Sequence, residues 1–243
     1  MRLTTALMGS GLALVVAASL LRYALPDAAA LRPELSLEPT QTETQAAPFQ
    51  TTVGGVTYTL TPRAQYEIWG LVVSQHDTRS WWNWIHEAWH DHLNVVDLCV
   101  VFAENAASGG YVGLNYSSGQ FVCYVQTGST EKWQRFSMRA LSNNHLLTDS
   151  PALARKLRDI RIGDQVRVRG LLTEYAHNDG FAFKRGTSLT RDDTGNGACE
   201  TIYVQDVEVL ARGGGPWRVL WWLGWVVMAG GGVLWLRSPF RIR

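Results

Sequence analysis

Two uninterrupted apolar segments near the ends of the chain constrain its fold most strongly. Residues 3–21 and 219–236 contain no charged side chain, and each reaches the roughly 18 to 20 residues that a helix needs to cross a bilayer. Tryptophans stand at both ends of the second segment, as they do at the boundary between lipid and water. We therefore expect two transmembrane helices, within residues 1–25 and 217–236, with a soluble region between them.

The first apolar segment has a second interpretation, because a secretory signal peptide also contains an apolar run. Ala28-Ala29-Ala30 would supply small residues for a cleavage site. The run is longer than the ~7–15 apolar residues typical of a signal peptide, and a single arginine, Arg2, precedes it. We favour an uncleaved anchor, with a cleaved signal peptide as the alternative.

The arginines beside the second apolar segment predict its orientation. Arg237, Arg241 and Arg243 follow the segment, against Arg212 and Arg218 before it. Since basic residues near a span favour the cytoplasmic side, we expect the carboxyl terminus in the cytoplasm. Two spans then return the amino terminus to the same side and place the soluble region outside. The formal net charge of +1 gives no attraction to nucleic acid, and no nucleic-acid partner is expected.

The soluble region begins with a segment of unusual composition. Residues 26–55 are rich in Ala, Pro, Thr, Glu and Gln and contain few large apolar side chains. Such a segment buries too little surface to fold alone. We therefore predict a flexible tether over residues 26–55 and a folded domain over residues 56–212.

The domain is expected to be mostly β. Alternating or β-branched runs predict strands near residues 66–73, 97–103, 120–126, 165–175 and 201–210. Asp149-Ser150-Pro151 offers a cap and a first-turn proline for one short helix. Three strands, a short helix and two further strands are the order of an OB-like five-stranded barrel. A β-sandwich or an α+β sheet is the alternative.

The segment over residues 185–200 combines charged groups, hydroxyls, glycines and a thiol in the order RGTSLTRDDTGNGACE. It resembles the signature R-[ST]-S-L-T-R-x-D-T-G-x-G-A-C-E of a functionally uncharacterised family of bacterial envelope proteins. Residues 58–74, 94–98 and 142–147 fit the same resemblance, which spans about residues 56–210. The resemblance implies an envelope protein and carries no established activity. With the predicted orientation, it places the chain in a bacterial inner membrane and the domain in the periplasm.

Residues 86–90 read His-Glu-Ala-Trp-His and match H-E-x-x-H. On a helix this pattern brings two imidazoles to a zinc ion and a carboxylate beside them as general base. The flanking residues are polar where such a helix continues apolar, and no third ligand stands at a typical spacing. We therefore expect no metal, with His86, His90 and His92 as weak candidates for an adventitious one.

A second possible metal site begins at Asp192, where oxygen-bearing residues alternate as at the start of a calcium loop. The twelfth position of this loop would be Tyr203 rather than Glu. An ordinary turn is therefore the expectation, and no cofactor is predicted.

Tryptophans are concentrated in a short stretch before and within the H-E-x-x-H match. Exposed tryptophan clusters usually contact a partner, a sugar or a membrane interface. Packing over the end of the barrel is the alternative. The members of this cluster are Trp81, Trp82, Trp84 and Trp89.

The signature segment supports two interpretations. Cys199 with His145 would be the minimum for a thiol nucleophile, and Glu200 stands beside the thiol. The other interpretation is a network of paired buried charges that fixes the loop. The candidate binding residues outside the tryptophan cluster are Asp97, Asn144, His145, Arg185, Arg191, Asp193 and Glu200.

Three cysteines in an oxidising compartment allow one disulfide and one free thiol. If residues 97–103 and 120–126 form an antiparallel pair, Cys99 and Cys123 stand opposite one another. We therefore favour the pair Cys99–Cys123, which leaves Cys199 free.

The function expected from these observations is a membrane-anchored extracytoplasmic module that binds a protein partner or an envelope component. This expectation depends on the tether, on the tryptophan cluster and on the weakness of each catalytic pattern. A Cys/His-dependent or metal-dependent envelope hydrolase is the alternative. Placement of His145 beside Cys199 in an open cleft would favour the enzyme.

Overall fold

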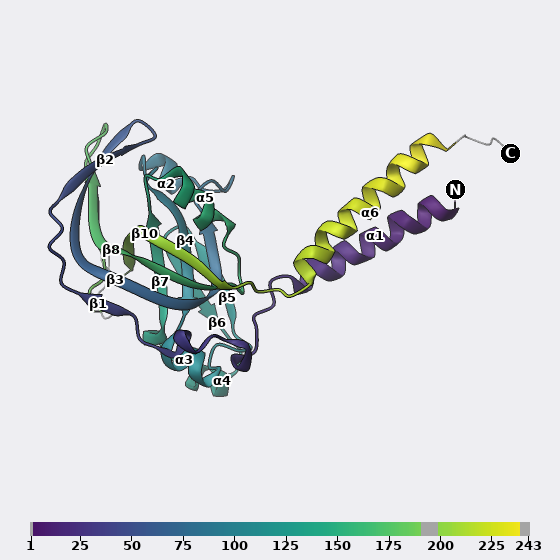
Figure 1. Ribbon diagram of the computed structural model, residues 1–243, viewed down its shortest axis with the longest axis horizontal. Coiled ribbons are helices and arrows are strands. Elements are labelled where there is room, and N and C mark those ends of the chain that lie inside the picture. Colours follow the sequence, from purple (N-terminus) through teal and green to yellow (C-terminus); the bar gives the residue numbers. More distant parts are fainter. Residues whose placement is uncertain (1, 191–198, 239–243) are drawn as a thin grey trace. The chain divides into compact units, whose positions relative to one another are not determined.

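The computed structural model describes residues 2–190 and 199–238, and the chain divides into two compact units (Figure 1). One unit contains the two terminal helices, and it runs to Leu25 and resumes at Arg212. The other unit is the soluble domain, Pro26–Ala211.

The helical unit consists of α1 (Arg2–Leu21) and α6 (Trp217–Arg237), which are long and apolar enough to cross a membrane. The two helices approach closely at glycines. A Cβ on Gly224 would lie 3.0 Å from the Gly11 carbonyl oxygen, and one on Gly231 would lie 3.1 Å from Leu7 Cβ. Small residues that permit close backbone approach are typical of helix pairs in membranes.

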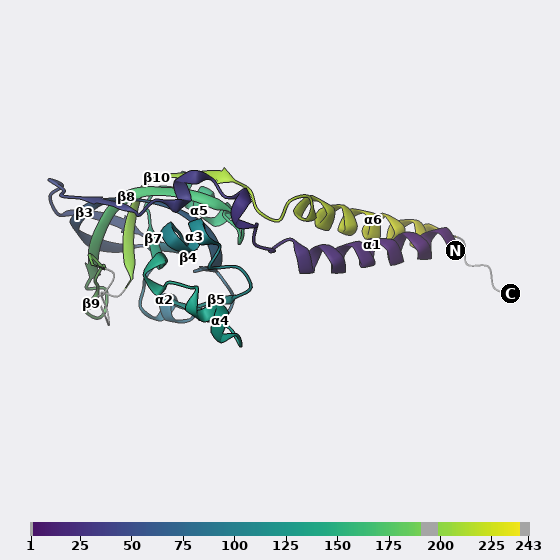
Figure 2. The same ribbon diagram turned by 90° about the horizontal axis from the view of Figure 1, so that it is seen from below.

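The soluble domain contains one large mixed sheet and a separate hairpin. In the described residues, the large sheet comprises β1 (Thr40–Thr42), β2 (Phe49–Val53), β3 (Val56–Asp77), β4 (Asn94–Val101), β7 (Leu141–Leu147), β8 (Gln165–His177), β9 (Phe183–Arg185) and β10 (Glu200–Ala211). The hairpin consists of β5 (Asn115–Gly119) and β6 (Val122–Gln126). Figure 2 shows β5 on the opposite side of the domain from β8 and β10. The expectation of a mostly-β domain is therefore confirmed.

Five strands of the large sheet pair in a circuit. β3 pairs with β4, β4 with β7, β7 with β10, β10 with β8, and β8 with β3 again. The pair β7–β10 is parallel and the other four are antiparallel. The main hydrophobic core includes Ile68, Val72, Leu98, Leu146 and Ile202, which come from four of these strands. The core therefore depends on pairings between segments that are distant in sequence.

Short helices occupy the connections. They are α2 (Ile85–Ala88), α3 (Ala103–Ser108), α4 (Thr130–Gln134) and α5 (Pro151–Asp159), together with the 3-10 turns η1 (Ala28–Ala30), η2 (Pro33–Ser36) and η3 (Met138–Ala140). α5 joins β7 to β8 and begins as predicted. Ser150 accepts a hydrogen bond from the Leu153 N–H, and Pro151 occupies the first turn, where its missing N–H costs nothing.

The predicted third strand of the barrel is wrong in position. Residues 120–126 were expected in the main sheet, but Val122–Gln126 pairs with β5 in the separate hairpin. The third strand of the circuit is Leu141–Leu147, which begins with the polar sequence Leu-Ser-Asn-Asn-His. A strand signal based on apolar alternation misses it, because its buried polar side chains are hydrogen-bonded to groups on other strands and on the hairpin.

The predicted flexible tether is part of the folded domain. Phe49–Val53 forms a hairpin with β3, and Thr40–Thr42 pairs with Gln65–Glu67 of the same strand. Leu35 is completely buried. The segment is poor in apolar side chains, but β3 is long enough to offer it a paired edge, so its backbone hydrogen bonds replace the core that it lacks.

Candidate functional site

Adjacent strands β4, β7 and β10 carry a group of buried polar residues, which the strand pairing divides between the two faces of the sheet. Residues paired across neighbouring strands share a face of the sheet. On one face Asp97 pairs with His145, and Cys99 pairs with Asn143. Glu200 pairs with Asn144, which belongs to the other face. The alternation of side chains therefore separates residues that are neighbours in the sequence.

His145 lies between a carboxylate and the thiol. Its Nδ1 is 2.7 Å from Asp97 Oδ1, and both side chains are completely buried. Cys199, which immediately precedes β10, is half-buried. Cys199 lies close enough to His145 for each group to affect the pKa of the other. A thiol, an imidazole and a carboxylate in this order are the parts of an activated nucleophile.

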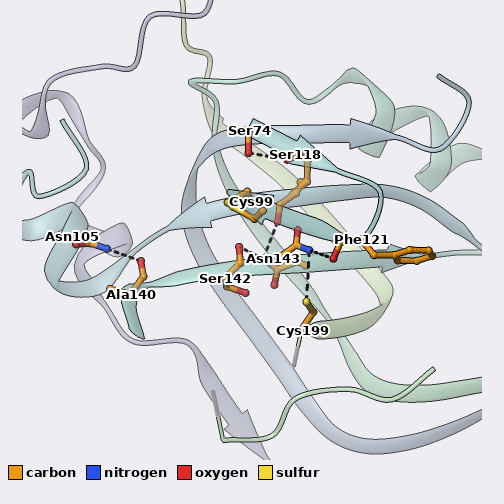
Figure 3. The surroundings of a disulfide bond; sticks show 12 residues. Ser74, Cys99, Asn105, Ser118, Phe121, Ala140, Ser142, Asn143 and Cys199 are labelled. Carbon is orange, nitrogen blue, oxygen red and sulfur yellow. Dashed lines mark hydrogen bonds between the residues drawn. A yellow bond between two sulfur atoms is a disulfide. The ribbon is translucent and has the colours of Figure 1, made fainter. Parts of the chain in front are cut away.

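Asn143 is the second polar contact of the thiol. Its Nδ2 is 3.7 Å from Cys199 Sγ and donates to the Phe121 carbonyl oxygen at 3.1 Å (Figure 3). Asn144, one of the predicted binding residues, does not contact the thiol: its Nδ2 donates to the carbonyls of Leu98 and Ser142 on the other face. In the pair Asn143-Asn144, only the strand register decides which asparagine faces Cys199.

Asp97 is held by donors that the sequence did not reveal. Asn94 Nδ2 donates to Asp97 Oδ1 at 2.8 Å, and the Phe121 N–H donates to Oδ2 at 3.2 Å. Asn94 stands three residues before Asp97 and in a regular strand would point to the opposite face. The pairing of β4 with β7 shifts register between Asn94 and Val96, and such a bulge reverses the side-chain alternation.

Phe121 covers the site from the turn between β5 and β6. Its φ of 64° places a bulky residue in the left-handed region, which such residues rarely adopt. The ring lies 5.3 Å from the His145 ring and 4.0 Å from the His86 ring, measured between centroids. The unusual backbone conformation is held by hydrogen bonds from its N–H to Asp97 and to its carbonyl from Asn143.

The buried charges at the site stabilise one another. Burial opposes ionisation of Asp97, but His145 outweighs it and holds the pKa of Asp97 well below its ordinary value. Burial also opposes protonation of His145, and Asp97 outweighs it and raises the pKa of His145 to about 9. Burial disfavours the Cys199 thiolate, yet the hydrogen bond and charge of His145 lower the pKa of Cys199. The arrangement therefore favours a thiolate more than an isolated thiol would.

Glu200 does not join this group. Its carboxylate accepts a hydrogen bond from Ser142 Oγ at 2.6 Å on the other face of the sheet. The acidic partner of His145 is therefore Asp97 rather than Glu200. Of the charged residues predicted to form a buried network, Asp97 and Arg185 both contact His145, and Arg185 NH2 lies 2.7 Å from His145 Nε2. Arg191 and Asp193, like the predicted turn that starts at Asp192, lie outside the described residues.

The H-E-x-x-H match is not part of a zinc helix. α2 has four residues, and His90 lies beyond it with a φ of 50°. His86 is buried, with Nδ1 2.6 Å from Asn83 Oδ1 and Nε2 3.1 Å from Asn94 Nδ2, whereas His90 Nδ1 contacts Asp179 at 2.7 Å. Burial lowers the pKa of His86 to about 4, so its ring is neutral and both nitrogens are engaged. Over residues 2–190 and 199–238, no group of three His, Cys, Asp or Glu side chains is placed to hold a metal ion, and His92 therefore completes no such group.

The tryptophan cluster divides into two pairs. Trp82 packs on the His76 ring at 4.4 Å and Trp89 on the Phe121 ring at 5.4 Å, between centroids. Trp81 and Trp84 project into solvent, with exposed fractions of 96% and 67%. Gln120 Oε1 accepts the N–H groups of Trp84 and Ile85, so the hairpin that carries Phe121 also holds this segment. Trp82 and Trp89 therefore pack on the domain, as the alternative interpretation expected, whereas contact of exposed Trp81 and Trp84 with a partner stays a prediction.

Cys99 and Cys123 form the predicted disulfide, which leaves Cys199 as the free thiol. The reason given for the pairing was wrong, because β6 does not pair with β4. The hairpin instead contacts the large sheet through side chains: Ser118 Oγ of β5 lies 2.8 Å from Ser74 Oγ of β3 (Figure 3). The disulfide therefore joins two separate sheets and fixes the hairpin above the thiol site.

Comparisons with protein-family models, with curated proteins and with solved structures find no match for this chain. The resemblance of the signature segment to an envelope family therefore stays a prediction.

Proposed function

We propose that this chain is an inner-membrane protein that displays an OB-like barrel on the periplasmic side of a bacterial membrane. Two candidate spans flank the domain, and a disulfide is compatible with an extracytoplasmic location. The OB-like assignment is supported by the circuit of five strands, by the parallel pairing of its third and fifth strands in chain order, and by α5 between its third and fourth strands.

The activity that the geometry supports best is thiol-dependent hydrolysis or acyl transfer at Cys199. The observation that carries this proposal is the position of His145 between Cys199 and Asp97. His145 would take the thiol proton, and the sulfur would attack an acyl carbon to form a thioester with release of the leaving group. Water would then cleave the thioester. Asp97 would hold the ring through Nδ1 and stabilise the imidazolium that forms.

The open cleft that would favour an enzyme is not met at His145, which is completely buried with Asp97, so only half-buried Cys199 could meet a substrate. A purely structural network is the competing interpretation, because His145 and Asp97 are completely buried. The two interpretations differ in what they expect of the thiol. A structural cysteine behaves as an ordinary buried thiol, whereas an activated one reacts at a pH below its ordinary pKa.

We predict that His145→Gln slows alkylation of Cys199 by iodoacetamide at neutral pH, because His145 lowers the pKa of Cys199 and its loss would leave less of the reactive thiolate. The measurement is the rate of iodoacetamide incorporation at Cys199 in the full chain, as a function of pH. His92→Gln is the matched control. Equal rates and equal pH profiles for the parent and His145→Gln would contradict thiol activation and leave the structural network.

Binding of a protein partner or envelope component is the second function with a specific observation in its favour. Trp81 and Trp84 expose most of their surface, and the Trp84 N–H donates to Gln120, the residue before Phe121. Tryptophan contributes more binding energy than most residues at protein interfaces, and exposing it in a free protein is costly. We propose that this pair contacts the partner on which Cys199 acts.

A photoreactive residue in place of Trp81 should give a discrete cross-linked product in intact cells. The same residue in place of exposed Lys156 on α5 should give none and serves as the control. Trp84→Ala should reduce the yield from position 81 without changing the melting temperature. The absence of any product from position 81 would count against a partner at this surface.

A further inference from the structure

Arg185 has an unusual environment for a cation. It ends β9, and its NH2 donates to His145 Nε2 at 2.7 Å, while its guanidinium carbon lies 3.9 Å from the centre of the Phe121 ring. Its Nε is buried without a hydrogen-bond partner, and no carboxylate of the described residues forms an ion pair with it. Neighbouring Lys184, by contrast, pairs with Glu174 at 2.8 Å.

A partly buried guanidinium without a carboxylate is costly. Its planar fork presents five N–H donors that match a carboxylate through two parallel hydrogen bonds. A histidine nitrogen and an aromatic face compensate for only part of the lost hydration. The donors that Arg185 does not use on the protein are therefore available to an anionic ligand beside Cys199.

The contact with His145 also fixes the state of the ring. A guanidinium can donate and cannot accept, so Nε2 accepts the hydrogen bond and carries no proton, and Nδ1–H donates to Asp97. The negative charge of Asp97 has the opposite effect, because it favours the protonated ring and raises the pKa of His145 to about 9. The direct contact decides between them, since two N–H groups facing each other at 2.7 Å would repel. The ring is neutral as long as Arg185 stays on Nε2.

Arg185 and the thiol proton therefore compete for the same nitrogen. Nδ1 is occupied by Asp97, so Nε2 is the position at which His145 would take the proton of Cys199. While Arg185 donates to Nε2, His145 can take the proton of Cys199 only when Arg185 moves aside. The free protein therefore activates the thiol in part, and a bound carboxylate would activate it fully. Withdrawal of Arg185 by about the length of a hydrogen bond would free Nε2 and let Asp97 support the imidazolium.

We propose that the substrate of the Cys199 site carries a carboxylate that binds Arg185, draws it away from His145 Nε2 and so switches on the thiol. This inference rests on the proposed thiol function and deepens it by naming the substrate class. The substrate would be an acyl compound with a free carboxylate near the scissile bond. Cys199 gives its proton to Nε2, the sulfur forms a bond to the acyl carbon, and the leaving group takes the proton from His145 as its bond breaks.

Two alkylating reagents of nearly equal shape test the proposal on the full chain. Iodoacetate carries a carboxylate and iodoacetamide a neutral amide, and each forms a C–S bond with release of iodide. We expect the ratio of the iodoacetate rate to the iodoacetamide rate at Cys199 to fall about tenfold or more in Arg185→Gln, as loss of a charge-assisted pair predicts. Arg185→Lys, which keeps the charge, should retain part of the ratio and serves if Arg185→Gln fails to fold.

Arg63→Gln is the matched control, because Arg63 is a partly exposed arginine of β3 that already pairs with Glu174. Its ratio should equal that of the parent. An equal fall in both variants would show a general charge effect and overturn the proposal. An unchanged ratio in Arg185→Gln, with reactivity that still depends on His145, would overturn the carboxylate and leave the thiol function intact. Loss of the dependence on His145 would overturn both.

Discussion

Asp97→Ala is expected to destabilise the domain by about 3–5 kcal/mol, a large share of the stability of an ordinary domain. Asp97 is completely buried and accepts hydrogen bonds from His145, Asn94 and the Phe121 N–H. Alanine would leave these donors without an acceptor in a site that water does not reach. Asp97→Asn keeps one carbonyl oxygen but turns an amide toward the Phe121 N–H, so we expect a smaller loss of about 1–3 kcal/mol.

Denaturant unfolding of the full chain in detergent, followed by pulse proteolysis of the domain, measures both losses. Asp206→Ala is the control, since Asp206 is 41% exposed and its ion pair with Arg167 lies at the surface. The depressed pKa of Asp97 adds a pH signature. Its stabilisation is fully present above about pH 4, the unfolded pKa, and is lost as the pH falls toward the folded pKa. A parent and an Asn variant with the same acid sensitivity would contradict this account.

The parts of the fold that the sequence predicted are those with a local cause. The apolar length of the terminal helices, the Ser150 cap and the alternation along β3 each depend on residues that are close in the chain. The order of strands and helix also followed from local signals, apart from the third strand. That strand was missed because Ser142, Asn143 and His145 are polar, and their burial is tolerated only through partners on other strands.

The thiol site was likewise predicted only where residue type alone was informative, and not where its contacts depend on the pairing of distant strands. Cys199 and His145 were recognisable as a candidate pair by residue type, but the acidic partner of His145 depends on the register of β4 against β7. A sequence cannot show the bulge that turns Asn94 toward Asp97, nor the hairpin turn that lays Phe121 over the ring. Glu200 was chosen for its closeness to Cys199 in the sequence, and consecutive residues of a strand point to opposite faces.

The disulfide gives the second large effect that we expect. Cys99 and Cys123 are 24 residues apart, and a loop of this length corresponds to a stabilisation of roughly 3 to 3.5 kcal/mol through the restricted unfolded chain. Reduction, or the Cys99→Ala/Cys123→Ala pair of substitutions, should therefore lower the free energy of unfolding by about this amount. Cys199→Ser should be milder, because Cys199 is half-buried and closes no loop.

Reduction should also change the thiol site, because the hairpin is the element that carries Phe121. Phe121 donates to Asp97, accepts from Asn143 and covers His145, and the disulfide fixes its hairpin to β4. A loosened hairpin would expose Cys199. In the Cys99→Ala/Cys123→Ala variant, alkylation of Cys199 should therefore be faster than in the parent under conditions in which both domains stay folded. Thiol trapping of protein taken directly from cells should find one free cysteine if the domain lies outside the cytoplasm. Three free cysteines would instead place the domain in a reducing compartment and remove the basis for the proposed topology.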